Sequence, residues 1–505
     1  MTQATALAIL KTGVNVFLTG EPGSGKTHLI NRYVAYLKTQ GITPSVTAST
    51  GIAATHIGGM TIHSWSGIGI KRSLSEFDLD ALSSKEYLVK RLTHAKVLII
   101  DEISMLDAET FATVDRVCRS IRRKPDTSFG GLQLIVVGDF FQLPPISSRG
   151  EAPARFVFES ASWRGAEFFV CYLSEQHRHT DPAHSALLAR IRRGEGDEEM
   201  LERLSALCEE GEVIDVDGAD VLTQLYTHNE DVDRINTERL HKLPGTTVSY
   251  PMSSQGKPAV VDQIKRGCLS PETLELKEGA AVMFTKNDFE SGFVNGTLGT
   301  VERFEEGQPV VLLRSGKRIT VAPMEWSIEE NGKLLGRINQ LPLRLAWAIT
   351  VHKSQGMSLD AAAMDLSKTF EYGQGYVALS RVRTLSGVML KGINGYALRV
   401  HPQIVERDEH FRERSEDAAG AFESLSSLEL SQMHRNFIKL VGGKAGATRE
   451  GANTRAYKPW TKEEEKKLTQ LFKKGESVTS IATALGRKPG GIYSRLAKLG
   501  LGEEN

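Results

Sequence analysis

Short apolar runs alternate with segments of helical spacing along the first part of the chain. Residues 14–18 read VNVFL, residues 97–100 read VLII, and residues 132–137 read LQLIVV. Each run has the length of a buried strand, and residues 28–34 follow the first run with the pattern of an amphipathic helix. Strands that alternate with helices predict an α/β fold.

The pattern changes in two later regions. Residues 279–330 contain short β-type runs separated by Gly and Asn-Gly turns, which predict a small β-barrel inserted in the second half of the chain. Residues 441–455 are rich in Gly, Ala and Thr, the composition of a flexible linker. Residues 460–499 then predict three short helices of the helix-turn-helix kind, opened by a Thr–Glu capping pattern.

Composition narrows the class of protein. A length of 505 residues predicts about three or four domains. The formal net charge is +0, so a polyanionic partner must bind in a local basic groove. The cysteines lie far apart and form no C-x-x-C pair, which argues against disulfides or a zinc site and predicts buried thiols: Cys118, Cys171, Cys208 and Cys268.

We find no leader-like segment in residues 1–10 and no apolar run of membrane-spanning length. We therefore expect a cytoplasmic protein with no membrane partner, associated with the nucleoid if the source is bacterial.

Residues 20–27 read GEPGSGKT and fit the phosphate-loop pattern G-x-x-x-x-G-K-[ST] between a predicted strand and a predicted helix. The glycines let backbone N–H groups surround phosphates, while Lys26 brings a charge to the β and γ phosphates. Gln3 can read the edge of adenine, because an amide both donates and accepts. The nucleotide-binding residues are predicted to be Gln3, Gly20, Gly23, Ser24, Gly25, Lys26, Thr27 and Asp101.

Two adjacent carboxylates end the buried run at residues 97–100. Asp101 and the Thr27 hydroxyl are predicted to hold Mg²⁺, and Glu102 to activate the attacking water. The next apolar run leads to Gln142, predicted to lie beside the γ-phosphate. ATP and Mg²⁺ are thus the expected ligands.

Hydroxyl residues follow the strand predicted near residues 42–48. Thr47, Ser49 and Thr50 are placed to bind a phosphodiester at a strand end, although a helix N-cap explains them equally well. His63 and Trp65 could contact a nucleic-acid strand, with core packing as the alternative.

The order of the motifs resembles the petite-integration-frequency (PIF-type) DNA helicases, RecD-like members of helicase superfamily one. The resemblance rests on the phosphate loop and on the stretches DEISML at 101–106, SFGGLQL at 128–134 and GDFFQLPP at 138–145. Residues 107–124 resemble the family's signature segment. This segment would support a DNA groove or be an ordinary amphipathic helix.

The resemblance extends to about residue 400 and implies further site residues. Arg178 in LSEQHR and Arg381 in YVALSRVRT correspond to the arginines that reach the γ-phosphate. Residues 348–356 are similar to the fifth motif, which implies DNA contacts by Thr350, His352, Lys353 and Ser354. The implied catalytic residues are Lys26, Glu102, Gln142, Arg178 and Arg381.

The predicted organisation is two RecA-like motor domains, residues 1–170 with a small insertion at about 56–90, and residues 171–400 with an SH3-like insertion at 280–335. A helical segment and linker follow at 401–456. The module at 457–505 resembles Myb-like helix-turn-helix modules and either binds DNA or docks a protein partner. Its expected DNA-facing residues are Lys488, Ser494, Arg495 and Lys498.

We expect an ATP-dependent DNA helicase that acts as a monomer on single-stranded, forked or structured DNA. The resemblance implies movement from 5′ to 3′ and a role in replication, repair, recombination or telomere-type maintenance, with G-quadruplexes among the possible substrates. The alternatives are a DNA-stimulated ATPase that remodels protein–DNA complexes without separating strands, and a P-loop kinase or GTPase. The second predicted lobe argues against the last of these.

Overall fold

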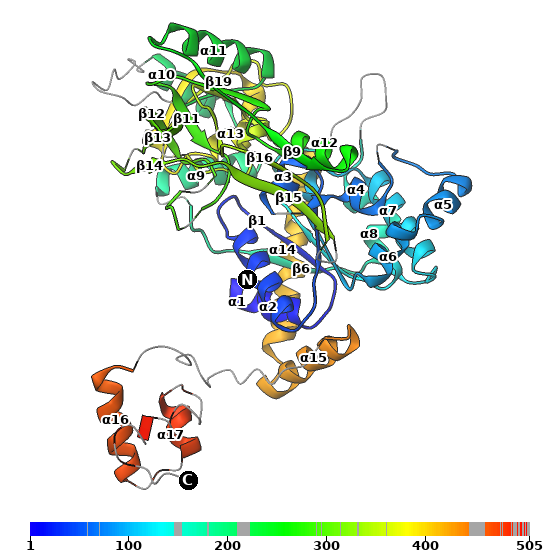
Figure 1. Ribbon diagram of the computed structural model, residues 1–505. Coiled ribbons are helices and arrows are strands. Elements are labelled where there is room, and N and C mark those ends of the chain that lie inside the picture. Colours follow the sequence, from blue (N-terminus) through cyan, green and yellow to red (C-terminus); the bar gives the residue numbers. More distant parts are fainter. Residues whose placement is uncertain are drawn as a thin grey trace. The chain divides into compact units, whose positions relative to one another are not determined.

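The structure is a computed structural model that describes residues 1–501, except 58, 70, 146–153, 179–180, 210–222, 289, 294, 314, 331–332, 360, 444–459, 475, 477, 486, 488–491, 493–494, 497–498 and 500. It divides into two compact units, Met1–Gly442 and Gly443–Asn505. The first unit holds two lobes, each built on a parallel sheet, drawn in blue and cyan and in green and yellow in Figure 1. The predicted α/β fold is confirmed.

The first lobe is organised around a parallel sheet of apolar strands. Both faces of this sheet are covered by helices, which explains why its strands read as continuous apolar runs. In sheet order the strands are β3 (Met60–Thr61), β2 (Ser45–Ala48), β4 (Val97–Asp101), β5 (Gln133–Val137), β1 (Val16–Gly20) and β6 (Phe169–Leu173).

Alternate residues of these strands enter two separate cores. Val16 and Leu18 pack in the core formed with α1 (Gln3–Lys11), α2 (Lys26–Thr39) and α15 (Ser427–Leu440). Phe17 packs in the larger core on the opposite face. On the side of the first lobe, the helices that contribute to this larger core include α4 (Ile62–Ser66), α5 (Glu76–Ser83), α6 (Glu86–His94), α7 (Ala108–Ile121), α8 (Ala161–Gly165) and α14 (Pro402–Glu423).

The sheet corrects one predicted domain boundary. The boundary expected at residue 170 falls inside β6, which pairs in parallel with β1 from Val16↔Phe169 to Gly20↔Leu173. The first lobe therefore includes Leu173. The insertion expected at about 56–90 forms α4, α5 and most of α6, which pack in the same core as α7.

The second lobe has a parallel sheet of short strands. In sheet order these are β18 (Ala348–Thr350), β7 (Thr223–Tyr226), β19 (Ala362–Leu366) and β20 (Val388–Ile393). Helix α11 lies beside β18, and α10 lies beside β20. The helices of this lobe are α9 (Pro182–Arg192), α10 (Glu198–Glu209), α11 (Asn229–Lys242) and α13 (Gln374–Leu379).

An antiparallel β region is inserted between the strands of the second lobe, where the β-barrel was predicted. It extends past the predicted end at residue 335, because the sheet needs β17 to pair with β11. Its sheet order is β14 (Arg318–Thr320), β13 (Gln308–Leu313), β12 (Leu298–Glu305), β11 (Ala281–Phe284) and β17 (Leu343–Leu345). Its SH3-like character stays a prediction.

Two smaller antiparallel sheets and one helix adjoin this β region. The larger sheet pairs β15 (Met324–Glu330) with β16 (Lys333–Gln340), and β16 with β9 (Ser253–Gly256). The smaller pairs β8 (Val248–Pro251) with β10 (Thr273–Leu276). Helix α12 (Pro258–Gly267) packs against β16 and against α3 (Gly51–His56) of the first lobe.

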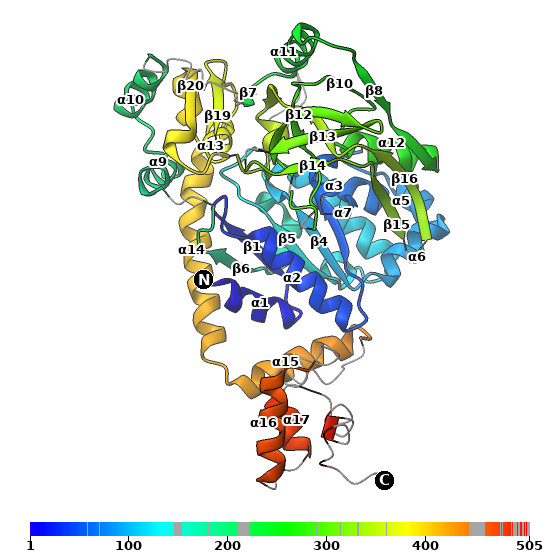
Figure 2. The same ribbon diagram turned by 60° about the vertical axis from the view of Figure 1, so that its left-hand side comes forward.

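After the second lobe the chain returns to the first. Helix α14 lies beside β6, as Figure 2 shows. Ser415 Oγ of this helix accepts a hydrogen bond from the Tyr172 N–H at 3.0 Å. Since β6 is an edge strand, this contact pairs a backbone N–H that the sheet itself leaves unpaired. Phe437 of α15 adds to the core beneath α1.

The second unit contains α16 (Lys462–Lys473) and α17 (Val478–Leu485) around a core that includes Leu468, Ile481 and Leu496. Thr461 and Glu464 form the predicted capping box at the start of α16. Most of the third predicted helix lies outside the described residues, as do Lys488, Ser494 and Lys498.

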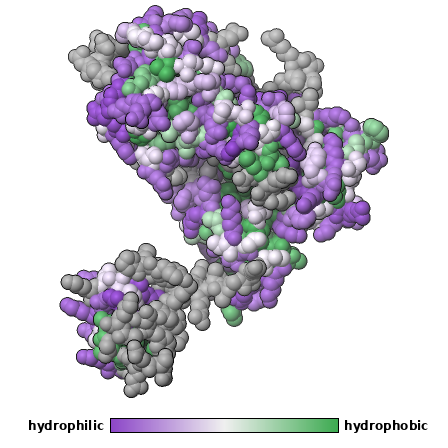
Figure 3. All heavy atoms as spheres, in the orientation of Figure 1, coloured by the Kyte–Doolittle hydropathy of each residue, from purple (hydrophilic) through white to green (hydrophobic). Residues whose placement is uncertain are grey.

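Figure 3 shows a mostly hydrophilic face with apolar residues in separate patches. Among the described residues no helix is both long and apolar enough to cross a membrane. Cys118, Cys171 and Cys268 are free thiols, and the first two are buried. The side chain of Cys208 lies outside the described residues.

Candidate active site

The phosphate loop joins β1 to α2 at the carboxyl end of the sheet. Gly25 has φ of 86° and precedes the first helical residue, a conformation that glycine adopts without steric cost. Ser24 is 1% exposed, and its Oγ has no hydrogen-bond partner in the described structure. Buried hydroxyls are normally paired, so this atom fits a site that receives phosphate oxygens.

Lys26 lies inside the loop. Its Nζ donates hydrogen bonds to the carbonyl oxygens of Gly20 at 2.8 Å and Glu21 at 3.0 Å. Burial lowers the pKa of Lys26, and the nearby Asp139 and Glu102 oppose this effect. The amine is therefore positioned by the backbone of the loop itself.

The N-terminal helix and the segment after β6 cover the phosphate loop. Gln3 Nε2 lies 3.3 Å from the carbonyl oxygen of Ser24 and 3.0 Å from His177 Nε2. The Gln176 side chain donates to the carbonyl of Pro22 at 3.1 Å. Gln3, which the sequence analysis assigned to the adenine edge, is thus in contact with the phosphate loop.

The two carboxylates at the end of β4 are half-buried and lie in a strained turn. Asp101 Oδ1 accepts the Glu102 N–H at 2.8 Å, and Glu102 has φ of 52°, a conformation that is rare outside glycine. Burial raises the pKa of both groups. For Glu102 the pKa rises to about 7, first through burial and then through the neighbouring Asp101.

Glu102 is held by a residue of the second lobe. Gln355, in the turn after β18, donates from Nε2 to Glu102 Oε2 at 3.0 Å. Gln355 belongs to the stretch 348–356 that is similar to the fifth motif, but the sequence analysis predicted no role for it. Only the tertiary fold brings Gln355 to Glu102.

A cavity of about 820 Å³ opens beside these carboxylates. The first lobe lines it with Thr27, Asp101 and Glu102, and the second lobe contributes Ser358 and Arg383. Among the described residues no cluster of three or more His, Cys, Asp and Glu forms a metal cage. Thr27 and Asp101 suit Mg²⁺, which keeps water and phosphate ligands in such sites.

The two predicted arginines, Arg178 and Arg381, lie close together, because both contact Ser380. Arg381 is 1% exposed, with Nη2 2.8 Å from Ser380 Oγ, and Arg178 Nη1 donates to the Ser380 carbonyl at 3.4 Å. Burial lowers the pKa of Arg381 to about 10, and burial with the nearby Arg381 and Arg383 lowers that of Arg178 to about 9. Arg178 is half-buried, and guanidiniums that crowd one another away from water favour a bound anion.

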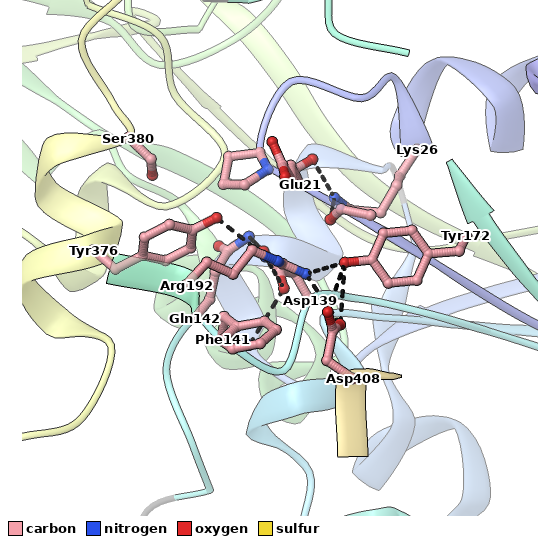
Figure 4. A network of polar contacts seen from close by, with 12 residues as sticks. Glu21, Lys26, Asp139, Phe141, Gln142, Tyr172, Arg192, Tyr376, Ser380 and Asp408 are labelled. Atoms are coloured by element: carbon pink, nitrogen blue, oxygen red, sulfur yellow. Dashed lines mark hydrogen bonds and ion pairs between the residues drawn. The ribbon is translucent and has the colours of Figure 1, made fainter. Parts of the chain in front are cut away.

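Gln142 is 7% exposed and lies beside Asp139. Its Nε2 donates to Asp139 Oδ2 at 3.4 Å, and Asp139 is paired with Arg192 of α9. Figure 4 shows these groups together with Lys26. The sequence analysis missed Asp139 and Arg192. Asp139 follows an apolar strand, which was a usable signal, but Arg192 stands among several surface-type arginines.

Two predicted DNA contacts of the first lobe need correction. Thr47 is fully buried, and its hydroxyl donates to the carbonyl of Ile99 at 2.7 Å. Ser49 Oγ donates to the carbonyl of Glu102 at 2.7 Å. Both hydroxyls join neighbouring strand ends, so their side chains are not presented to a DNA strand.

Two predicted contacts of the second lobe are corrected for the same reason. Ser354 is fully buried and donates from Oγ to the Val351 carbonyl at 2.7 Å. Thr350 is 2% exposed and accepts the N–H of Lys353 through its hydroxyl at 3.3 Å. These hydroxyls shape the turn that carries Gln355.

Other predicted contacts remain accessible. Thr50 is half-buried and accepts the Ala53 N–H at 3.3 Å, so the N-cap explanation applies to it. His63 is half-buried with a pKa lowered by burial, whereas Trp65 is 2% exposed and belongs to the core.

In the second lobe, His352 and Lys353 are also half-buried. His352 Nε2 lies 3.4 Å from Glu371 Oε2. Burial and the neighbouring Arg344 lower the pKa of Lys353.

The phosphate loop, the paired carboxylates and the arginines of the other lobe define a P-loop nucleoside triphosphatase whose site is shared between two lobes. The family model of the PIF1-like helicases matches residues 1–194, and that of the DNA helicase Pif1 2B domain matches residues 260–304. The chain belongs to the PIF1-like helicase family. The resemblance inferred from the motifs is confirmed.

The chain is 42% identical to the ATP-dependent DNA helicase Pif1 of Psychrobacter sp. (strain PRwf-1), over 94% of this chain and 80% of that protein. It spans 62–63% of the length of the PIF1 helicases of Xenopus laevis and Danio rerio. Pif1 from Bacteroides sp in complex with ADP-AlF4 is 30% identical, with a TM-score of 0.70 over 81% of this chain and 96% of that chain. Bacteroides Pif1 bound to ssDNA gives 31% identity and a TM-score of 0.55 over 82% and 97%.

Proposed function

We propose that this protein is an ATP-dependent DNA helicase that binds single-stranded DNA across its two lobes. One observation carries the proposal: Gln355 of the predicted strand-binding motif donates to Glu102, the predicted water-activating carboxylate, at 3.0 Å. A DNA strand that displaces the motif therefore acts on the hydrolytic carboxylate directly. The names of the relatives, which are ATP-dependent DNA helicases, support the same activity.

The chemistry follows from the residues around the cavity. Lys26 lies where the phosphate loop can bring it to the β and γ phosphates, and Glu102 accepts a proton from the attacking water. Gln142 and the two arginines stabilise charge on the transferred phosphoryl group. Mg²⁺, held by Thr27 and Asp101, would neutralise phosphate charge when bound.

The substrates are single-stranded, forked or structured DNA, and movement is from 5′ to 3′. Forked DNA is supported by a similar solved structure, described as DNA unwinding at forked dsDNA by two coordinating Pif1 helicases. The direction rests on the family likeness alone. A place in replication, repair or recombination, at the nucleoid if the source is bacterial, follows from this activity.

The second unit is an additional DNA-binding module in this proposal. Its residues 457–505 include ten Lys and Arg against six Asp and Glu. Two arginines are used internally: Arg487 pairs with the buried Glu464, and Arg495 pairs with Glu465. The expected DNA-facing role of Arg495 is therefore replaced by a structural one, and the exposed lysines of α16 carry the positive charge.

ATP hydrolysis with and without single-stranded DNA tests the proposal. We expect DNA to raise kcat strongly in the wild type, and Lys26→Ala to lower kcat by about 10²-fold or more. Gln355→Ala should lower the DNA-stimulated rate more than the rate without DNA. Equal rates of the wild type with and without DNA would refute the proposed function.

A further inference from the structure

A buried arginine network joins the two lobes beside the nucleotide site (Figure 4). At its centre is Arg192, the last residue of α9. Its Nη1 donates to Asp139 Oδ1 at 2.8 Å and Oδ2 at 3.0 Å, and to the Tyr376 hydroxyl at 3.1 Å. Its Nη2 donates to the Tyr172 hydroxyl at 2.8 Å and lies 3.6 Å from Asp408 Oδ1.

The partners of Arg192 come from separate parts of the chain. Asp139 follows β5, Tyr172 lies in β6 and Asp408 lies in α14, all of which pack in or against the first lobe. Tyr376 lies in α13 of the second lobe. Because Arg192 itself belongs to α9 of the second lobe, its contacts with the first three residues cross between the lobes, and the Tyr376 hydroxyl ties the guanidinium to α13.

In the first lobe, the network contacts residues 139–142, which we call the sensor segment. Besides Arg192, Asp139 accepts hydrogen bonds from the Phe141 N–H at 3.3 Å and from Gln142 Nε2 at 3.4 Å. The guanidinium lies 4.0 Å from the centroid of the Phe141 ring. The orientation of Gln142 thus depends on a carboxylate that Arg192 holds.

In the second lobe, the network continues through α13 to Arg381 and Arg178. Tyr376 is on α13, which ends beside Ser380, and Ser380 contacts both Arg381 and Arg178. Gly373, at the start of the same helix, lies so close to the sensor segment that a Cβ there would come within 2.5 Å of the Phe141 and Gln142 carbonyl oxygens. The helix and the sensor segment are therefore in direct contact.

The central side chains of this network are buried, so removing one of them costs free energy. Arg192 is 3% exposed, Asp139 is 0% exposed and Tyr376 is 1% exposed. A buried charge pair is expensive to desolvate, and removal of one partner leaves the other charge uncompensated. A link of this kind holds two segments in one relative position, since few alternative positions satisfy all its hydrogen bonds.

We propose that Arg192 is a positioning residue that couples the sensor segment to helix α13, which leads to Ser380 and Arg381, and that the Tyr376 hydroxyl completes this coupling by joining Arg192 to α13. This inference rests on the proposed function. It explains how Gln142, predicted to contact the γ-phosphate, and the two predicted phosphate-binding arginines are positioned relative to one another. Arg192 touches neither phosphate nor DNA in this role.

Tyr376→Phe tests the proposal, because it removes one hydroxyl and leaves the Asp139–Arg192 pair intact. Tyr33→Phe is the matched control. Tyr33 is also fully buried in the first lobe, and its hydroxyl donates to Gln133 Oε1 at 2.8 Å, away from the network. Melting curves of both variants first establish that they are folded.

We expect Tyr376→Phe to lower DNA-stimulated kcat by about tenfold to 10²-fold, the rate equivalent of one hydrogen bond to a charged group, with KM for ATP unchanged. Tyr33→Phe should lower the melting temperature without lowering kcat. In a Gln142→Ala background, Tyr376→Phe should cause no further loss, because the coupled residue is already absent.

A wild-type kcat in Tyr376→Phe overturns the inference, and so does an equal loss with and without Gln142. Equal loss in Tyr376→Phe and Tyr33→Phe also overturns it, because the effect would then be one of stability. These outcomes leave the proposed function standing provided that DNA stimulates the wild type. Absence of stimulation in the wild type overturns both.

Discussion

At the scale of single residues, Glu102 combines the features expected of a hydrolytic group. It has a left-handed backbone, a raised pKa and a hydrogen bond from the other lobe. Only the ionised carboxylate can accept a proton from water. In the proposed mechanism the pKa of Glu102 therefore sets the pH range of ATP hydrolysis.

We predict that kcat rises with pH through about 7, the value to which burial and Asp101 raise the pKa of Glu102. Glu102→Gln should bind ATP and lower kcat by about 10²–10⁴-fold, as loss of a general base does. Rates measured from pH 5.5 to 9 at saturating ATP and DNA check this. A flat wild-type profile, or full turnover by Glu102→Gln, would contradict the assignment.

The raised pKa of Glu102 also predicts how stability depends on pH, in the direction opposite to kcat. Folding raises the pKa of Glu102 above its ordinary value of 4.5, so the contribution of this carboxyl group favours the folded state at low pH. That contribution is lost as the pH rises through about 7. Glu102→Gln should therefore be more stable than the wild type at pH 8 in urea unfolding, and less active. Lower stability of the variant would argue against a buried ionised carboxylate.

Some of these residues could be predicted from the sequence, and others could not. Lys26 and Glu102 stand in motifs whose spacing fixes their place on a strand end or helix start. Thr47 and Ser354 were wrongly predicted to bind DNA, because a small hydroxyl at a strand end serves the backbone as readily as a ligand. Gln355 and Arg192 act through contacts between distant segments, for which no local pattern exists.

At the scale of elements, helix α7 shows what the family's signature segment does. Asp115 in its middle is 3% exposed. Its carboxylate accepts hydrogen bonds from the Phe129 N–H at 2.7 Å, from Arg119 Nε at 2.8 Å and from Ser162 Oγ at 2.7 Å. The helix thus fixes the tight turn before β5, and β5 leads directly to the sensor segment.

We predict that Asp115→Ala lowers the free energy of unfolding of the first lobe by about 2–4 kcal/mol, because it leaves several buried donors without an acceptor. Glu109→Ala is the control, since Glu109 is an exposed residue of the same helix. Chemical unfolding of both variants checks the difference. Equal stability of the two would show that α7 contributes only its apolar face.

At the scale of the whole molecule, the apolar runs predicted the α/β class, but not where each lobe ends. Strand β6 was divided by the predicted boundary because a strand pairs with partners far away in sequence. The β region was predicted too short because β17 lies beyond a long hairpin. Helix α14 gave no signal that it returns to the first lobe.

The two compact units predict that the chain can be cut at Gly443 without loss of the motor. The truncated protein should keep DNA-stimulated ATP hydrolysis and bind duplex-containing DNA more weakly, with a shallower salt dependence because fewer phosphates are neutralised. Binding to forked DNA at several salt concentrations checks this. An unchanged affinity and salt slope would instead assign the second unit to a protein partner.

Strand displacement tests the central claim most directly. Two otherwise identical duplexes, one with a 5′ and one with a 3′ single-stranded tail, are mixed with the full chain and ATP, and Lys26→Ala serves as the control. We predict that the wild type separates the 5′-tailed duplex, and that neither the 3′-tailed duplex nor the Lys26→Ala reaction yields free strands. DNA-stimulated ATP hydrolysis with no displacement of either duplex would contradict the helicase assignment and leave a remodelling ATPase.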